Sequence, residues 1–211
     1  MSRRLQWIGW GTLLGFPLLG ALVLWIFQKP VLATMLRSEL NPVLQIGLGG
    51  AIGTLLGLGA RYIVSLPILL PIAEKYSGLV YRMKLKSRDV YFLSFCAGFG
   101  EELFFRGAFQ PLVGLWPAAI IFVAIHGYLN PMNWRVSIYG IYMTLAIALL
   151  GYLTEWWGIW TACVAHMVID IILFQFLIKL GHRQARSFEY PAAEVDSHSG
   201  VATNSETHEA P

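Results

Sequence analysis

The chain has 211 residues, of which 56% are hydrophobic and only 13% are charged, and its formal net charge is +3. A soluble globular domain carries about 25% charged residues. The composition therefore argues against a soluble fold and predicts an all-α, polytopic transmembrane helix bundle. The small net charge gives no indication of a nucleic-acid partner, and the lipid bilayer is the expected environment.

Apolar segments long enough to cross a membrane recur along the chain. A helix of about 20 apolar residues crosses a bilayer, and the sequence predicts about six such spans. The first follows Met-Ser-Arg-Arg and is longer than the apolar part of a signal peptide, so we expect it to be retained as a signal anchor. The fourth is short and is expected to gain length at either end or to be partly re-entrant. The expected spans are residues 7–27, 42–66, 90–110, 117–128, 136–151 and 157–178.

The second expected span carries Gly49, Gly53 and Gly57 at intervals of four residues. Residues at this interval share one helix face, and small residues there let two helix backbones approach closely. A phosphate-binding glycine loop is the alternative, but these glycines are not followed by the lysine and hydroxyl residue that end such a loop. The spacing therefore predicts a helix-packing surface.

Lysine and arginine residues are distributed unevenly between the loops. With six spans, the basic clusters before the first span, after the second and after the last fall on one side, which the positive-inside rule makes cytoplasmic. Both termini are therefore expected in the cytoplasm, and the pattern suits a bacterial inner membrane. The cations concerned are Arg3 and Arg4, then Lys75, Arg82, Lys84, Lys86 and Arg88, and finally Lys179, Arg183 and Arg186.

Charged residues interrupt the third expected span at Glu101, Glu102 and Arg106. A charge near the bilayer centre costs at least about 2.5–3.5 kcal/mol, so these residues need partners, water or a chemical role. Glu102 and Arg106 lie four residues apart and can pair on one helix face. Glu101 is rotated by about 100° from Glu102 and is free to point elsewhere.

Candidate partners lie in two further apolar segments, at His126 and at His166 with Asp170. From the helical rise, Glu101 lies about 17 Å from the cytoplasmic end of its span, whereas His126 and His166 each lie about 14 Å from the opposite end of theirs. In a hydrocarbon core about 30 Å thick, these depths agree within a few Å. We therefore predict that Glu101, His126 and His166 share one site.

Three motifs carry a family resemblance: Glu101-Glu102-x-x-x-Arg106, Phe122-x-x-x-His126 and His166-x-x-x-Asp170. Their order and spacing resemble those of the CAAX-processing and bacteriocin-processing (CPBP, or Abi) family of intramembrane proteases. With this resemblance, the chain divides into an N-terminal two-span region with a basic loop (1–88), a protease core (89–180) and a polar tail (181–211). The tail has no apolar periodicity and is expected to be disordered in the cytoplasm.

The resemblance implies hydrolysis of a peptide bond within the membrane. Glu101 and His126 would activate a water molecule, and His166 and Asp170 would polarise the scissile carbonyl and stabilise its oxyanion. Glu102 and Arg106 would be structural, neutralising each other and holding the helix of the first motif.

Two chemical questions stay open on the sequence. An ionised aspartate cannot donate a hydrogen bond to an oxyanion, so Asp170 is either protonated or accepts a hydrogen bond that orients His166, and we favour the second. Glu101, His126 and His166 could also hold a catalytic zinc ion with an open position for water. The expected cofactor is accordingly none or zinc.

Two alternative functions lie outside proteolysis. A non-catalytic membrane scaffold or immunity protein would keep the bundle without its chemistry, and a transporter would be expected to contain inverted repeats and broken helices. The sequence contains no internal repeat that we can identify. The expected partner is a peptide or protein substrate in or at the membrane.

Overall fold

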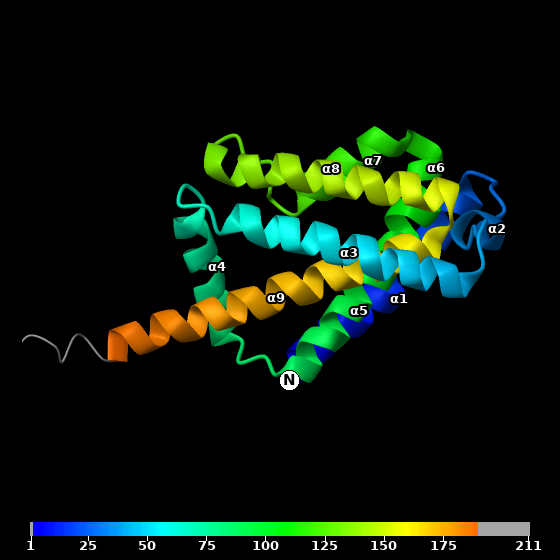
Figure 1. Cartoon of the computed structure of the whole chain (residues 1–211). Coiled ribbons are helices and arrows are strands. Elements are labelled where there is room, and N and C mark those ends of the chain that lie inside the picture. Colours follow the sequence, from blue (N-terminus) through cyan, green and yellow to red (C-terminus); the bar gives the residue numbers. More distant parts are fainter. Residues whose placement is uncertain (1, 190–211) are drawn as a thin grey trace, which may run out of the picture.

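A computed structural model describes residues 2–189, and these residues form helices joined by short connections (Figure 1). No β-strand occurs within them, so the predicted all-α bundle is confirmed. In chain order the elements are α1 (Arg3–Ile26), α2 (Val31–Met35), α3 (Pro42–Val64), α4 (Leu70–Arg82), α5 (Ser87–Phe104), the π-helical turn η1 (Phe105–Phe109), α6 (Gln110–Val113), α7 (Leu115–Ile125), α8 (Trp134–Trp156) and α9 (Ile159–Glu189).

Four of the described helices, α1, α3, α8 and α9, are long and apolar enough to cross a membrane. Helix α5 carries Glu101 and Glu102 of the first motif, and it continues through η1, which carries Arg106, and α6 to Val113. At the helical rise this continuous stretch exceeds a hydrocarbon core of about 30 Å. The chain is an integral membrane protein.

The expected fourth span is only partly helical. Helix α7 has 11 residues and covers about 16 Å, and it ends before Gly127, whose φ of +77° lies in the left-handed region. Residues 126–133 then run beside the first turns of α8, where Ser137 accepts a hydrogen bond from the Asn130 amide and donates one to its carbonyl. Irregular backbone at membrane depth needs such protein partners. The short apolar run therefore ends where Gly127 and Asn130 favour a turn.

The glycine surface predicted on the second span is confirmed as the contact between α3 and α9. Gly49 lies against the Thr161 carbonyl, and a Cβ added to Gly53 would come within 2.7 Å of the Ala165 Cα. Gly57 continues the same face against Ile169. This seam fixes α3 beside the helix that carries His166 and Asp170.

A second close contact, which the sequence analysis did not predict, joins α1 to α5. A Cβ added to Gly100 would collide with the Thr12 backbone, and one added to Gly20 would meet the Ala108 side chain. The first helix therefore lies directly on the helix that carries Glu101 and Glu102.

Helix α9 extends further than the sequence predicted, and this corrects the boundary of the expected disordered tail. Residues 181–189 are helical, and residues 190–211 lie outside the described part of the chain. The physical reason is α4, which packs against this extension: Ser77 Oγ donates a hydrogen bond to Gln184 Oε1 at 2.8 Å. The Tyr81 ring also meets the His182 ring edge-on at 5.0 Å.

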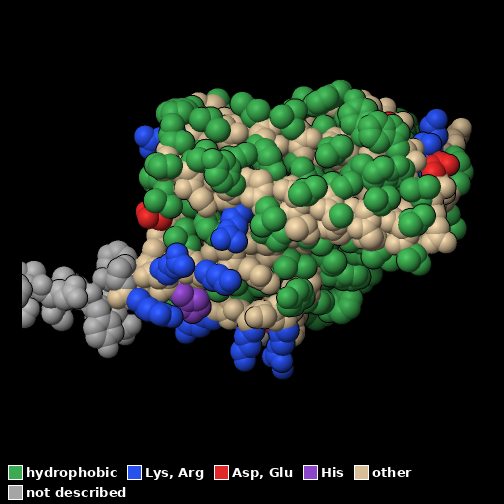
Figure 2. Space-filling model, in the orientation of Figure 1, with side chains coloured by type: hydrophobic (Ala, Val, Ile, Leu, Met, Phe, Trp, Pro, Cys, Tyr) green, Lys and Arg blue, Asp and Glu red, His purple; other side chains and the backbone are tan. Residues whose placement is uncertain are grey.

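The two ends of the bundle differ in charge. Figure 2 shows Lys and Arg side chains gathered, on the face in view, around the place where α9 leaves the bundle. Arg82, Lys84 and His182 line one depression there, so the α4–α5 connection and the end of α9 lie together. The opposite end carries the surface ion pair of Arg37 with Glu39. The basic α4–α5 connection and the basic end of α9 therefore share one end of the molecule.

Candidate active site

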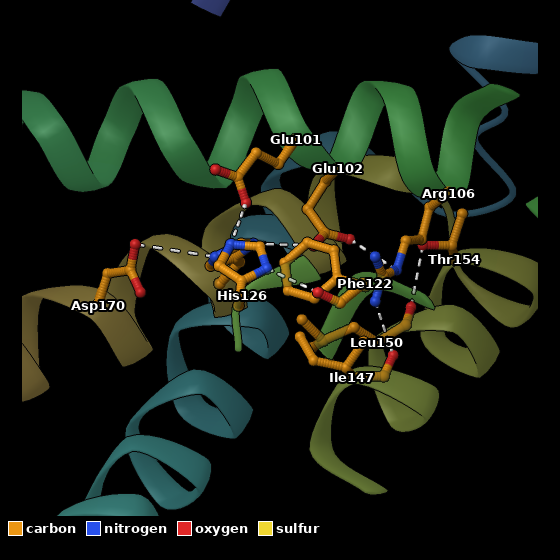
Figure 3. Close-up of polar contacts among 10 residues, drawn as sticks. Glu101, Glu102, Arg106, Phe122, His126, Ile147, Leu150, Thr154 and Asp170 are labelled. Carbon is orange, nitrogen blue, oxygen red and sulfur yellow. Dashed lines mark hydrogen bonds and ion pairs between the residues drawn. The ribbon is translucent and has the colours of Figure 1, made fainter. Parts of the chain in front are cut away.

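The three sequence motifs meet inside the bundle (Figure 3). Glu101 and Glu102 lie in the last turn of α5, His126 is the residue that ends α7, and His166 and Asp170 lie on α9. A cavity of about 390 Å³, the central cavity, is lined by Glu101, His126, His166 and Asp170. The predicted convergence of these side chains is therefore observed.

Glu101 and His126 form the closest pair of ionisable motif side chains that both line the central cavity. Glu101 Oε2 lies 3.5 Å from His126 Nε2, and His126 Nδ1 lies 2.7 Å from the Phe122 carbonyl oxygen. Because a carbonyl oxygen only accepts hydrogen bonds, Nδ1 carries the hydrogen, and in the neutral ring the lone pair is on Nε2. Glu101 Oε2 is buried and has no hydrogen-bond partner among the described residues. Two proton acceptors thus face each other at the cavity.

Phe122 explains the spacing of the second motif. Its ring stacks on the His126 ring with centroids 4.4 Å apart, and the Arg106 guanidinium lies 4.9 Å from the centroid of the Phe122 ring. It also meets His166 edge-on at 5.7 Å. The side chain packs among the polar groups and limits the orientations open to His126.

Glu102 and Arg106 form the buried ion pair that the sequence predicted. Arg106 Nε lies 3.0 Å from Glu102 Oε2, in ion-pair contact without the alignment of a hydrogen bond, and both side chains are at most 1% exposed. Arg106 also donates a hydrogen bond to the Ile147 carbonyl on α8 at 3.0 Å. The pair therefore ties α5 to α8 as well as balancing charge.

The other oxygen of Glu102 makes a contact that the sequence analysis missed. Glu102 Oε1 accepts a hydrogen bond from His166 Nδ1 at 2.8 Å. Asp170, which was expected to orient His166, lies 3.8 Å from its Nε2, which is beyond hydrogen-bond distance. This expectation is corrected: Glu102 orients His166. The spacing of four residues favoured Asp170, but a carboxylate on the neighbouring helix reaches the ring more closely.

The expected zinc ligands do not form a ligand set in this structure. Within the described residues, no three His, Cys, Asp or Glu side chains lie close enough together to hold a metal ion. Glu101, His126 and His166 border one cavity without closing around a common point. We therefore derive no chemical step through a metal.

Two tyrosines outside the three sequence motifs also line the site. The Tyr128 ring lies parallel to the His126 ring at 6.2 Å, and Tyr139 meets Tyr128 edge-on at 5.2 Å. Both line the central cavity and a second, largely apolar cavity of about 240 Å³ between α4, α8 and α9. Asp170 borders both cavities, so they are contiguous around these three side chains. The nearness of Tyr128 to His126 in the chain was the only sequence signal.

The helix of the first motif changes register directly after the carboxylates. Residues Phe105–Phe109 form the π-helical turn η1, which contains Arg106. Such turns are rare and occur often at functional sites. Gly107 in η1 lies against the Met35 backbone, so the π-helical turn also packs against α2.

Comparison with known proteins agrees with the motifs. Residues 87–172 match the family model described as "Type II CAAX prenyl endopeptidase Rce1-like". The match spans all three motifs and confirms, over this segment, the resemblance to the CPBP family. The uncharacterized protein YpbD of Bacillus subtilis (strain 168) is 38% identical over 96 residues, which are 44% of this chain and 47% of that protein. The match thus spans about half of the relative's length. No solved structure matches the chain.

Proposed function

We propose that this protein is an intramembrane endopeptidase that cleaves a membrane-anchored or membrane-associated peptide with water activated by Glu101 and His126. The observation that carries the proposal is the 3.5 Å approach of Glu101 Oε2 to His126 Nε2 at a cavity inside the bundle. A carboxylate and an imidazole that line one cavity can both hydrogen-bond a single water molecule placed beside them.

The proposed reaction uses the Glu101 carboxylate and the His126 Nε2 atom, which both face the central cavity. The water oxygen attacks the scissile carbonyl carbon while Glu101 takes one proton from the water. His126 Nε2 accepts a hydrogen bond from the other water hydrogen. Glu101 then gives its proton to the leaving amide nitrogen as the C–N bond breaks. The proton removed from water thus returns on the amine product, and Glu101 is regenerated.

His166 is proposed to stabilise the oxyanion. Its Nδ1–H donates to Glu102, so Nε2 can donate to an oxyanion only when the ring holds both protons. Glu102 at one nitrogen and Asp170 at 3.8 Å from the other supply the negative charge that favours this imidazolium. Asp170 would act through charge, while Glu102 fixes the direction of the ring.

The second cavity suggests which substrate could reach this site. It is lined mainly by apolar side chains of α4, α8 and α9, and it meets the central cavity at Tyr128, Tyr139 and Asp170. An apolar peptide segment would bury its side chains there while its backbone crosses to Glu101 and His126. The expected partner is therefore a peptide segment in or at the membrane.

Glu101→Gln tests the proposal because it keeps the side-chain shape and removes the base. Cleavage of a membrane-anchored peptide library should fall by at least about 10²–10⁴-fold. The matched control is Glu74→Gln, an exposed carboxylate on α4 outside both cavities. In water labelled with ¹⁸O, one labelled oxygen should enter the new carboxyl group. Full cleavage by the Glu101→Gln variant would contradict the proposal. If the Glu101→Gln variant still performed the protein's role in the cell without cleaving peptides, the scaffold alternative would be favoured.

We further propose the metal-free form of this mechanism, because Glu101 and His126 suffice to activate water and leave His166 for the oxyanion. Treatment with a chelator should leave cleavage undiminished. Loss of activity that zinc restores would instead assign metal-assisted hydrolysis.

The charge difference between the two ends of the bundle motivates the proposed location. We place the protein in a bacterial inner membrane, with the basic end and both termini in the cytoplasm. Reporter fusions after Arg88 and at the C-terminus should both report the cytoplasm. A periplasmic signal at either point would reverse this orientation.

A further inference from the structure

A groove on the outside of the bundle is separate from both cavities of the candidate active site. It has a volume of about 180 Å³ and lies between the last turns of α3 and the second half of α9. Leu58, Ile172 and Phe176 supply apolar walls, and Arg61, Lys179 and Arg183 bring positive charge to it. We refer to this feature as the α3–α9 groove.

Three cations converge on the groove, and within residues 2–189 no carboxylate lines it. The Arg61 guanidinium lies 5.6 Å from the centroid of the Phe176 ring. Lys179 and Arg183 lie four residues apart and so share one face of α9. None of the three makes an ion pair within residues 2–189. Like charges held together in this way favour an anion between them.

The depth of the groove indicates the source of that anion. Gly53 packs against Ala165, next to His166, and Arg61 follows eight residues later, about 12 Å along α3. Lys179 lies about 20 Å beyond His166 along α9. With the active site near the middle of a core about 30 Å thick, these positions bracket the boundary between acyl chains and headgroups. This holds for either orientation in the membrane.

We infer that the α3–α9 groove binds an anionic phospholipid, with its phosphate between Arg61, Lys179 and Arg183 and an acyl chain along Leu58, Ile172 and Phe176. Basic pockets between membrane helices bind anionic headgroups, and long cationic side chains at this depth reach toward them. A free phosphate would satisfy the charges but leave the apolar wall uncovered. A phospholipid satisfies both and is always present at this level.

The bound lipid would extend the contact between two helices. The glycine seam of α3 with α9 ends at Gly57, which packs against Ile169 and Ile172, and the groove begins directly beyond it, at Leu58 and Ile172. A phosphate shared by Arg61 and Lys179 would join α3 to α9 beyond the seam. Because α9 also carries His166, the lipid would steady the helix on which the candidate active site depends.

A lipid titration tests the inference on the full-length protein. Purified protein in neutral detergent is titrated with phosphatidylglycerol or phosphatidylcholine, and bound lipid is counted by native mass spectrometry. The wild type should prefer phosphatidylglycerol, and Arg61→Gln/Lys179→Gln should lose about 25-fold in affinity, or about fivefold for each cation. The matched control is Lys75→Gln/Arg82→Gln, which removes the same charges from α4, outside the groove.

The control pair should stay within about twofold of the wild type, and soluble glycerol phosphate should fail to displace the lipid. Equal losses in both pairs would show general attraction to a basic surface and overturn the site. Displacement by glycerol phosphate would also overturn it, because the groove would then bind a free anion. Should the double variant not fold, the single variants Arg61→Gln and Lys179→Gln provide the same comparison.

Discussion

Helix α9 is held on two sides by contacts of opposite chemistry. Toward α3 it meets Gly49, Gly53 and Gly57, where the absence of side chains lets the two backbones touch. Toward α5 its His166 donates a hydrogen bond to Glu102, whose other oxygen pairs with Arg106. A larger side chain at the glycines would not fit in the α3–α9 contact. In the contact with α5, removing one charge would leave another buried charge without a partner.

The difference shows how helices associate where lipid removes the usual driving force. Lipid tails are as apolar as leucine, so helix association in a membrane depends on close packing and on polar contacts. This bundle uses close packing for the seam and buried polar groups at the site. The four predictions that follow test the two sides of α9 separately, from the largest expected effect to the smallest.

Breaking the buried ion pair should have the largest effect on stability. Arg106→Ala leaves the fully buried Glu102 carboxylate uncompensated, which costs about 3–5 kcal/mol. Membrane abundance and resistance to denaturant should both fall. Arg88→Ala, at a side chain that is 77% exposed, should change stability by less than about 0.5 kcal/mol. Normal accumulation of an inactive Arg106→Ala variant would mean that Arg106 serves the chemistry.

Added volume in the seam should cost less, but still enough to measure. A Cβ at Gly53 would lie 2.6 Å from the Ala165 carbonyl oxygen, so Gly53→Ala forces the backbones of α3 and α9 apart. Overpacking of this kind costs about 1–3 kcal/mol. Gly50 on the same helix has no atom within 4 Å of such a Cβ, and Gly50→Ala should be neutral or stabilising. Equal unfolding midpoints for the two variants would show that the seam is looser than the structure implies.

Two double variants separate charge balance from the orientation of His166. Glu102→Leu/Arg106→Met removes both charges and should be more stable than Arg106→Ala alone, since neutralising a buried pair is often tolerated. It also removes the acceptor of His166 Nδ1–H, so cleavage should fall by about 10–100-fold, by analogy with carboxylates that orient metal-bound histidines.

The matched variant Glu102→Gln/Arg106→Met keeps an acceptor oxygen at the same position. Its cleavage rate should lie between those of the wild type and the leucine variant at similar stability. Equal rates for the two double variants would contradict the orienting role of Glu102.

The smallest effect is expected at Asp170. Because it lies 3.8 Å from His166 Nε2 and makes no orienting hydrogen bond to it, Asp170→Asn removes charge without freeing the ring. Cleavage should fall by less than about tenfold. A larger loss in steady-state rates, with unchanged unfolding, would assign Asp170 a direct part in the reaction.

Much of the fold follows from features that lie along a single helix. Apolar length predicts a membrane bundle, and the spacing of Gly49, Gly53 and Gly57 predicts a seam that the structure places against α9. The depth of Glu101, His126 and His166 follows from residue counts because a helix rises by a fixed distance per residue. The ion pair of Glu102 with Arg106 was predictable for the same reason, since four residues bring two side chains to one face.

Contacts between helices were not predictable in this way. The α1–α5 contact, the helix α4, and the support that α4 gives to residues 181–189 depend on which helices become neighbours. Glu102 was expected to serve only Arg106, yet it also holds His166 on another helix. Periodicity specifies which face a residue occupies and leaves open which helix that face meets.

The sequence by itself determined that the protein is a helical membrane bundle, and it predicted which polar residues would share one site. Only the tertiary structure decided that Glu101 faces His126, that Glu102 rather than Asp170 orients His166, and that three cations meet at the α3–α9 groove. The reason is geometric. The position of a residue along its helix and the helix face that it occupies both follow from counting residues along one helix axis. Which residues contact it from other helices depends instead on how several helices pack side by side.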